Sequence, residues 1–428
     1  MSDAISQEYV GGFDEARFRE VRNALGGRDA REEAFGLYRR AEFPHGFIEE
    51  WRRTDPAWFP LGRLAFDPAL GRGRDGAGAG PEDDRFDVVV SIGDAGMSVR
   101  DVSGAIQAGR LVVDSPEAAD LLQRASDLGV KSAAPNKLAL LQAAFWNVGV
   151  RLRVPDGVEL EHGVLVRAAF AKDGSIAIPR IVVEAGRGSR VVILEELSSA
   201  ADRAVLVAAS REMRADKNAS LQYVMLQELG GRSLYLADDR ARAERNGRVH
   251  WIGLNFGAQL GKMNFSGEVA GEGGAAELDG LYFASGEQHL DQRTLQIHSA
   301  PHTTSNLLYK GAVRDRARSV YQGLIIARPG AVKVDAYQKN NNIVLNEGAR
   351  ADSLPGLEID TDDLKCSHGS TIGNLDAEQV FYLRTRGMDE AGARRTLLKG
   401  FFEEISARVP FESVRERIER HVEEKIGL

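Results

Sequence analysis

The sequence has little of three features that assign many chains to a class. It contains one cysteine, Cys366, which excludes an intrachain disulfide framework and fits a reducing compartment. It has no apolar run near the roughly 18 residues that a membrane span needs. It also lacks a basic excess, with 55 Lys and Arg against 63 Asp and Glu and a formal net charge of -8. Nucleic acid is therefore a poor candidate partner, because phosphate binding needs a basic face.

The first residues, Met1 to Ile5, are polar and acidic. They show neither the basic and apolar regions of a signal peptide nor the Arg-rich pattern of a transit peptide. We therefore expect a cytoplasmic protein with no membrane association. The length of 428 residues, with 43% hydrophobic and 28% charged residues, predicts a large central domain with smaller appendages.

Residues 1–149 are predicted to form an N-terminal helical region. Apolar residues recur at helical spacing over 12–53 and again between Leu121 and Trp146. Residues 71–84 are rich in Gly, Arg and Asp and predict a flexible loop, and a short strand is expected at 86–92.

Residues 150–370 are predicted to form a β core, because short β-type runs alternate with turns of small and charged residues. The predicted strands are 180–184, 190–194, 204–208, 221–226, 249–254, 278–283, 319–326 and 342–345, and the turns are 185–189, 214–219, 270–275, 328–331 and 347–349. Turn intervals of roughly 18 to 30 residues, with 46 glycines, suit a coiled β architecture with one or two strands per turn. A β-sandwich or barrel remains an alternative.

Residues 371–428 are predicted to form a C-terminal helical domain. Asp376 is a candidate N-cap, and Gly387 is placed to end the first helix. A second amphipathic helix precedes Pro410. The last helix carries a narrow apolar stripe from Val414 to Ile426, which favours docking onto another surface over lining a core.

The sequence has few motifs that indicate catalysis or ligand binding. There is no dinucleotide or Walker A motif, and there is no HExxH, CxxC or GxSxG motif. Cys366 and His368 are two residues apart, so on a strand both side chains would share one face and could converge on a soft or borderline metal ion. Two ligands do not complete a tetrahedral site, so further donors would come from another chain. Alternatively, both residues are structural.

Two further groups of polar residues have structural and functional interpretations. His289, His298 and His302 match no familiar zinc spacing, and hydrogen bonds between neighbouring turns explain them equally well. The run 338–342, Gln-Lys-Asn-Asn-Asn, suggests nucleic-acid contact, but we interpret it as an asparagine-rich corner whose amides cap turn backbones.

The region from His298 to Phe402 resembles the SufB/SufD family of iron–sulfur cluster assembly proteins. Residues 50–55, Glu-Trp-Arg-Arg-Thr-Asp, also resemble an N-terminal element of that family. The Cys-Ser-His-Gly segment is similar to the SufD branch, because SufB proteins carry a different segment and further cysteines. The blocks that carry the resemblance are 305–311, 338–345, 354–359, 365–369 and 381–387.

The resemblance implies a mainly β fold, a right-handed parallel β-helix between N-terminal and C-terminal helical regions. It implies a non-catalytic scaffold that pairs with a SufB-type paralogue and docks the SufC-type ABC ATPase of the SufBCD complex. Iron or an iron–sulfur cluster would then rest on the complex transiently and not stably on the isolated chain, with His368 as a candidate ligand and Cys366 beside it. The candidate ATPase-docking residues lie in the C-terminal helices: Phe381, Tyr382, Arg386, Leu397, Leu398, Phe401 and Phe402.

Two other functions remain open at this stage. The chain could be a purely structural partner or a homodimer with no metal role. It could also be a β-helix hydrolase or lyase that acts on polysaccharide with carboxylates such as Asp291, Asp335 and Asp360, but no pair of them has a spacing that implies partnership.

Overall fold

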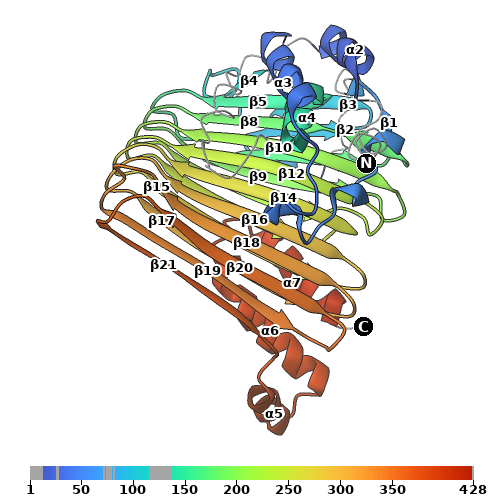
Figure 1. Cartoon of the computed structure of the whole chain (residues 1–428), viewed down its shortest axis with the longest axis vertical. Coiled ribbons are helices and arrows are strands. Elements are labelled where there is room, and N and C mark those ends of the chain that lie inside the picture. Colours follow the sequence, from blue (N-terminus) through green and yellow to red (C-terminus); the bar gives the residue numbers. More distant parts are fainter. Residues whose placement is uncertain are drawn as a thin grey trace.

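The computed structural model describes residues 13–25, 28–70, 73, 80, 82–114 and 137–426. These residues are mostly in β-strands, which stack into two facing sheets with helices at both ends of the chain (Figure 1). From β5 onward the chain passes back and forth between the two sheets, which makes a parallel β-solenoid.

Sheet A and sheet B are the two walls of the solenoid. Sheet A contains, in spatial order, β4 (Val112–Asp114), β5 (Val148–Val154), β8 (Pro179–Ala185), β10 (Val205–Ala215), β12 (Leu234–Ala243), β14 (Leu260–Val269), β16 (His289–His298), β18 (Arg318–Ala327) and β20 (Arg350–Ile359), with β7 (Ser175–Ala177) and β1 (Ala65–Phe66) at its side. Sheet B contains β3 (Gly96–Asp101), β2 (Val88–Gly93), β6 (Val164–Phe170), β9 (Arg190–Ser199), β11 (Ser220–Glu228), β13 (Arg248–Asn255), β15 (Ala275–Ala284), β17 (Thr304–Val313), β19 (Val334–Val344) and β21 (Leu364–Gly373).

Each solenoid turn contributes one long strand to each sheet. Residues paired between adjacent strands of one sheet are separated by the length of one turn. This length is 26 residues where Leu234 pairs with Leu260, and 32 residues where Arg318 pairs with Arg350. From β5 to β21 all of these pairings are parallel. The predicted parallel β-helix with helical ends is therefore confirmed, and the sandwich and barrel alternatives are excluded.

The predicted turns lie at the corners of the solenoid. Asn218 and Asn246 occupy successive corners with positive φ angles of 59° and 52°, a conformation that asparagine tolerates better than most residues. The Asn246 side-chain amide donates a hydrogen bond to the side-chain oxygen Oδ1 of Asn218 at 3.1 Å. Corner side chains thus connect one turn to the next.

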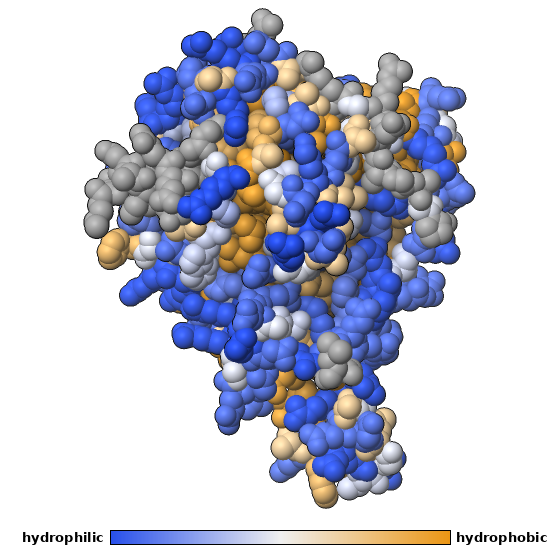
Figure 2. Space-filling view, turned by 90° about the vertical axis from the view of Figure 1, so that its right-hand side faces the viewer, coloured by the Kyte–Doolittle hydropathy of each residue, from blue (hydrophilic) through white to orange (hydrophobic). Residues whose placement is uncertain are grey.

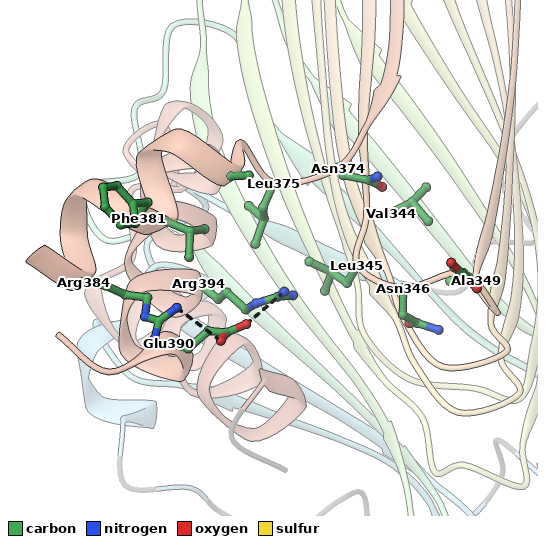
Figure 3. Close-up of a pocket in the computed structure, with 13 residues that line it drawn as sticks. Val344, Leu345, Asn346, Ala349, Asn374, Leu375, Phe381, Arg384, Glu390 and Arg394 are labelled. Atoms are coloured by element: carbon green, nitrogen blue, oxygen red, sulfur yellow. Dashed lines mark ion pairs between the residues drawn. The ribbon is translucent and has the colours of Figure 1, made fainter.

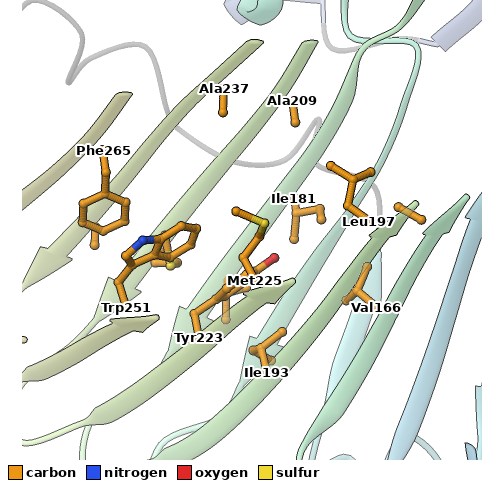
Figure 4. Packing of buried hydrophobic residues seen from close by; sticks show 14 of the residues in the cluster. Val166, Ile181, Ile193, Leu197, Ala209, Tyr223, Met225, Ala237, Trp251 and Phe265 are labelled. Atoms are coloured by element: carbon orange, nitrogen blue, oxygen red, sulfur yellow. The ribbon is translucent and has the colours of Figure 1, made fainter. Parts of the chain in front are cut away.

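The interior between the sheets is packed with apolar side chains over most of its length. In Figure 4 Ile193, Tyr223 and Trp251 from sheet B meet Ala209 and Phe265 from sheet A. Strands such as β9 are apolar on both faces because helices cover the outer faces of the sheets, which explains runs such as Val-Val-Ile-Leu.

The N-terminal helices cover the outer face of sheet A. Helices α2 (Glu15–Leu25), α3 (Arg28–Arg40) and α4 (Lys137–Phe145) form a cluster with outward residues of sheet A such as Ile178 and Leu206. Three short 3₁₀ helices follow α3: η1 (Glu49–Trp51), η2 (Pro56–Trp58) and η3 (Leu61–Arg63).

The predicted boundary after residue 149 falls inside β5. Strand β2 pairs in parallel with β6, so part of the N-terminal region continues sheet B. The core also extends beyond the predicted 150–370, from Val148 to Gly373. Most of the predicted loop 71–84 lies outside the described residues, although Asp83 starts the 3₁₀ helix η5 (Asp83–Arg85). Residues 121–136 of the second predicted helical stretch also lie outside them.

The three C-terminal helices are α5 (Ala377–Thr385), α6 (Glu390–Ser406) and α7 (Glu412–Ile426). Asp376 caps α5 as predicted, and its carboxylate accepts the backbone N–H of Glu378 at 2.8 Å. The apolar stripe of α7 is buried against sheet B, where Val414, Ile418 and Val422 pack with residues such as Leu254. The surface onto which the stripe packs is therefore sheet B of the same chain. None of the described helices is long and apolar enough to cross a membrane.

Candidate functional site at the open end of the solenoid

The last solenoid turn consists of β20 and β21, the terminal strands of their sheets (Figure 1). Among the described residues, no strand pairs with their outer edges. Leu357, Ile359 and Ile372 on this turn are large apolar residues that remain exposed. Unpaired edges with exposed apolar side chains are typical of surfaces that associate with another chain.

Cys366 and His368 lie on one face of β21, as their spacing predicts. Their partners on β19 are Ala336 and Gln338 respectively, and directly paired residues project to the same side of a sheet. His368 is exposed, and Cys366 is half-buried. The structure therefore brings the thiol and the imidazole onto the same exposed edge strand.

This face of β21 points across the solenoid toward sheet A. Ser370, two residues beyond His368, donates a hydrogen bond to the Ser353 hydroxyl of β20 at 2.8 Å, and Ser353 donates to the side-chain oxygen Oδ1 of Asn340 at 2.6 Å. Cys366 and His368 thus belong to the inner face of the solenoid, which is open at its last turn.

The Cys366 thiol is packed against Val334 and Ala336 at the base of this open turn. Burial raises the pKa of the Cys366 thiol above its ordinary value, because an apolar environment disfavours the thiolate. A smaller fraction of the Cys366 thiol is therefore in the thiolate form that binds metal ions and attacks electrophiles.

The asparagine-rich run 338–342 lies within β19 and not at a corner, which corrects our interpretation. Asn340 still reaches the preceding turn, where its amide donates to the Tyr309 carbonyl oxygen at 3.3 Å. Asn342 donates to Asn340 at 2.7 Å and accepts a hydrogen bond from Tyr282. The solenoid interior therefore becomes polar in its last turns.

The described residues contain no group of three or more His, Cys, Asp or Glu side chains that could hold a metal ion. His289 and His298 start and end β16, and each has its own polar partner. His298 is hydrogen-bonded to Thr303 and Ser305, both at 2.8 Å, and burial lowers its pKa to about 4. His289 is hydrogen-bonded to Thr54 at 2.9 Å, so hydrogen bonds explain His289 and His298, while the interpretation of His302 stays a prediction.

A groove of about 500 Å³ separates the corner after β19 from helices α5 and α6 (Figure 3). Leu375 and Phe381 supply apolar surface to it. Glu390 lies between two arginines, 3.8 Å from Arg384 and 3.3 Å from Arg394, measured between nitrogen and oxygen. The groove therefore combines apolar and charged walls.

Helix α5 projects from the body of the molecule and has no buried residue (Figure 1). The lobe at the bottom of Figure 2 carries apolar side chains on its surface. Phe381 and Tyr382 are 67% and 56% exposed, and the Arg386 guanidinium lies over the Tyr382 ring at 5.2 Å. A helix with exposed aromatic side chains and no buried residue is suited to contact a partner.

The other predicted docking residues divide into two groups. Leu398 and Phe402 are buried against sheet B, so they are not available to a partner, which corrects their assignment. Leu397 and Phe401 are half-buried on the same helix. An amphipathic pattern alone does not distinguish a helix face that packs within the chain from one that packs on another protein.

Several buried polar groups were not found from the sequence. Lys262 and Asp291 form an ion pair of 3.0 Å under the 3₁₀ helix η1, and Thr54 donates to Asp291. Inside the solenoid Arg211 pairs with Glu195 and Asp239. Each pair joins residues from different strands, so no local spacing reveals it.

These features define a parallel β-solenoid with helices on both outer faces and a histidine and a cysteine on its open end. A family model described as "SUF system FeS cluster assembly, SufBD core domain" matches residues 168–401. The chain belongs to this SufBD family, and its membership points to iron–sulfur cluster assembly.

Individual relatives agree with this family. An iron–sulfur cluster assembly SufBD family protein of Mycobacterium tuberculosis is 32% identical over 310 residues, 70% of this chain and 77% of the relative. One from Synechocystis is 32% identical over 211 residues, 49% of this chain and 47% of the relative. The iron–sulfur cluster assembly protein SufD of Escherichia coli is 28% identical over 236 residues, 55% of this chain and 56% of that protein.

Proposed function

We propose that this chain is a SufD-type, non-catalytic scaffold subunit for iron–sulfur cluster assembly. It pairs with a SufB-type paralogue through its last solenoid turn and docks a SufC-type ABC ATPase through its C-terminal helices. The observation that carries the proposal is the open edge of β20 and β21, where exposed apolar residues surround His368 and Cys366. Pairing would cover both edges and place these two side chains at the interface.

Iron and the nascent cluster are the cargo of this site. His368 is the stronger candidate ligand, because an exposed imidazole nitrogen is accessible to iron and suits it chemically. Cys366 would have to lose its thiol proton before it could bind, and burial opposes that loss. Two donors from this chain do not complete a coordination sphere, so the remaining ligands would come from the paralogue.

The ATPase would bind at α5. Its Phe381 and Tyr382 rings are exposed, and the groove beside it can receive an apolar side chain flanked by charged groups. Helix α6 follows α5 after the turn at residues 386–389 and packs on sheet B, so α6 connects α5 to the solenoid wall.

The central experiment is to co-express the chain with SufB-type and SufC-type partners, purify the complex without oxygen, and reconstitute it with iron and sulfide. His368→Ala should lower the cluster absorbance while the complex stays intact. His162→Ala is the matched control, because His162 is also exposed but precedes β6, far from the open turn along the solenoid.

An unchanged cluster yield in His368→Ala would make this subunit a structural partner without a metal role. Failure to form any complex would overturn the scaffold proposal itself. The polysaccharide enzyme has lost support, because Asp291 is buried in an ion pair with Lys262 and does not reach solvent.

ATPase docking has a separate test, the affinity of the partner for Phe381→Ala and Tyr382→Ala. Both variants should bind the ATPase more weakly without loss of stability, because both rings are exposed. Phe47→Ala is the control, since Phe47 is 96% exposed in the N-terminal segment. Equal binding by all three variants would remove α5 from the docking surface.

A further inference from the structure

Helix α5 receives little support from the rest of the described chain. Val380 and Leu383 are half-buried, and the other residues of the helix are exposed. The ion pair between Arg384 and Glu390, which links α5 to α6, measures 3.8 Å between two exposed side chains. Exposed ion pairs of this kind contribute little to stability, so packing against the solenoid does not hold α5 in its helical form.

The helix is also short, with 9 residues. Isolated helices shorter than about 12–15 residues are marginally stable in water, because fixing the first turn costs conformational entropy that few hydrogen bonds offset. In most proteins the packing of an apolar helix face supplies the missing stability. Since no residue of α5 is buried, its helical form depends mainly on its own two ends.

Both ends of α5 are capped by neighbouring residues of the same segment. The Asp376 carboxylate accepts the backbone N–H groups of Glu378 at 2.8 Å and of Gln379 at 3.4 Å. At the other end Gly387 has a φ angle of 95°, which favours glycine, and its N–H donates to the Arg384 carbonyl at 3.1 Å. These caps determine where the helix begins and ends without attaching it to the solenoid.

Helix α6 differs from α5 in burial, although it begins with the same kind of cap. The Asp389 carboxylate accepts the backbone N–H of Gly392 at 2.7 Å. The helix has 17 residues, and its buried side chains are those of Ala393, Leu398, Phe402, Ile405 and Ser406. Leu398, Phe402 and Ile405 pack on sheet B, so tertiary contacts hold α6 in its helical form.

We propose that α5 is in equilibrium between helix and coil in the isolated chain and becomes fully helical when the ATPase docks on it. The inference rests on the proposed docking of the ATPase at α5. A partner that binds only the helical form has an apparent Kd equal to its intrinsic Kd divided by the helical fraction. Docking thus orders the segment that follows β21, the strand that carries Cys366 and His368.

Hydrogen exchange of the full chain, followed by mass spectrometry, measures this equilibrium. In the isolated chain, peptides that cover residues 377–385 should exchange at nearly the rate of an unstructured chain. Peptides that cover residues 393–405 of α6 should exchange much more slowly, because that helix is buried against sheet B. Addition of a SufC-type ATPase should slow the exchange of residues 377–385.

Substitution of the two caps tests whether the helical fraction sets the affinity. Asp376→Ala removes both cap hydrogen bonds and should weaken ATPase binding by roughly 2- to 10-fold. Asp389→Ala is the matched control, because it removes the cap of a helix that packing holds, and it should leave the affinity unchanged. Asp376→Asn keeps a capping oxygen and should retain the wild-type affinity, which distinguishes a cap from a charge that contacts the ATPase.

Two results would overturn the inference. The first is exchange of residues 377–385 in the isolated chain that is as slow as exchange in α6, because α5 would then be a preformed helix. The second is an equal loss of affinity in Asp376→Ala and Asp389→Ala, because the helical fraction of α5 would then not determine binding.

The outcome is separable from that of the proposed function. Slow exchange of α5 in the isolated chain, together with weaker ATPase binding by Phe381→Ala, would keep the docking site and overturn the equilibrium. Fast exchange that the ATPase does not slow would overturn docking at α5, and with it the coupling of docking to helix formation.

Discussion

Glu50 and Arg293 form an ion pair of 2.9 Å between residues that are 243 positions apart. The other Glu50 carboxylate oxygen accepts a hydrogen bond from Asn264 at 3.2 Å, and Lys262 donates to the Glu50 backbone carbonyl at 2.8 Å. These contacts attach the 3₁₀ helix η1 to strands β14 and β16 on the outer face of sheet A. The resemblance of residues 50–55 to a family element is therefore explained by a structural role.

Replacement of Glu50 tests this attachment. Glu50→Gln should lower the free energy of unfolding by about 1–3 kcal/mol, because it removes a charge-assisted contact and leaves Arg293 largely buried without its counter-ion. Urea denaturation measures the change. Glu49→Gln is the control, since Glu49 is an exposed neighbour whose pairs with Arg52 and Arg53 should contribute less than about 1 kcal/mol. Equal losses in the two variants would contradict the assigned role of Glu50.

The sequence predicted strands best where both faces of a strand are apolar. Residues 221–226 and 249–254 lie in β11 and β13, which face the solenoid interior and the C-terminal helices. Strands β12 and β14 were missed, because charged outward residues such as Asp238, Arg240 and Lys262 interrupt the apolar pattern. A strand with one polar face resembles a loop when its partner strand is unknown.

The sequence also predicted the shared face of Cys366 and His368, because alternation along a strand depends only on local spacing. It did not predict that Gln338 lies opposite His368, since that pairing depends on the register of two turns 30 residues apart. The buried pair of Arg211 and Glu195 escaped detection for the same reason. Contacts between turns require the register, which the turn lengths alone do not determine.

Substitutions of Phe402 and Phe381 should distinguish a side chain that packs within the chain from one that is available to a partner. Phe402→Ala removes a ring buried between α6 and sheet B and should lower the free energy of unfolding by about 3–5 kcal/mol. Phe381→Ala removes an exposed ring and should change stability by less than about 0.5 kcal/mol. Thermal and urea unfolding measure both variants. A large loss of stability in Phe381→Ala would show that α5 packs within the chain.

His298 should make the fold sensitive to acid. Burial lowers its pKa from 6.5 to about 4, so folding favours the neutral ring. The contribution of His298 to the free energy of unfolding is fully present above 6.5, the pKa of the ring in the unfolded chain. It is lost as the pH falls from 6.5 toward 4, and the free energy of unfolding then decreases by up to about 1.4 kcal/mol per pH unit. His289, whose pKa is also lowered to about 4 by burial, acts in the same direction.

The measurement is urea unfolding of His298→Gln at several pH values across this range. Its stability should fall less steeply with acid than that of the wild-type chain, because one proton uptake on unfolding is removed. His162→Gln is the control, because His162 is exposed, and it should retain the wild-type slope. If the free energy of unfolding of His298→Gln depends on pH as steeply as that of the wild-type chain, His298 is not the group whose protonation destabilises the fold.

Cys366 should react slowly with alkylating reagents in the folded chain. Its thiol is half-buried, and burial raises its pKa, so both access and the thiolate fraction are reduced. Since Cys366 is the only cysteine, the total rate of iodoacetamide labelling reports on this site alone. The control chain carries Cys366→Ser with Ser367→Cys, which moves the thiol to the exposed neighbouring position.

The control chain should be labelled several-fold faster than the wild-type chain near neutral pH, and the two should react at the same rate in urea. The wild-type rate should also continue to rise with pH beyond the point at which the control levels off, because its thiolate forms at higher pH. Equal rates in the folded state would show that the open turn leaves Cys366 as accessible as a surface thiol, and the argument against Cys366 as a ligand in the isolated chain would fail. Slow labelling would instead imply that any ligation by Cys366 depends on a partner that changes its surroundings, because the isolated fold keeps the thiol protonated.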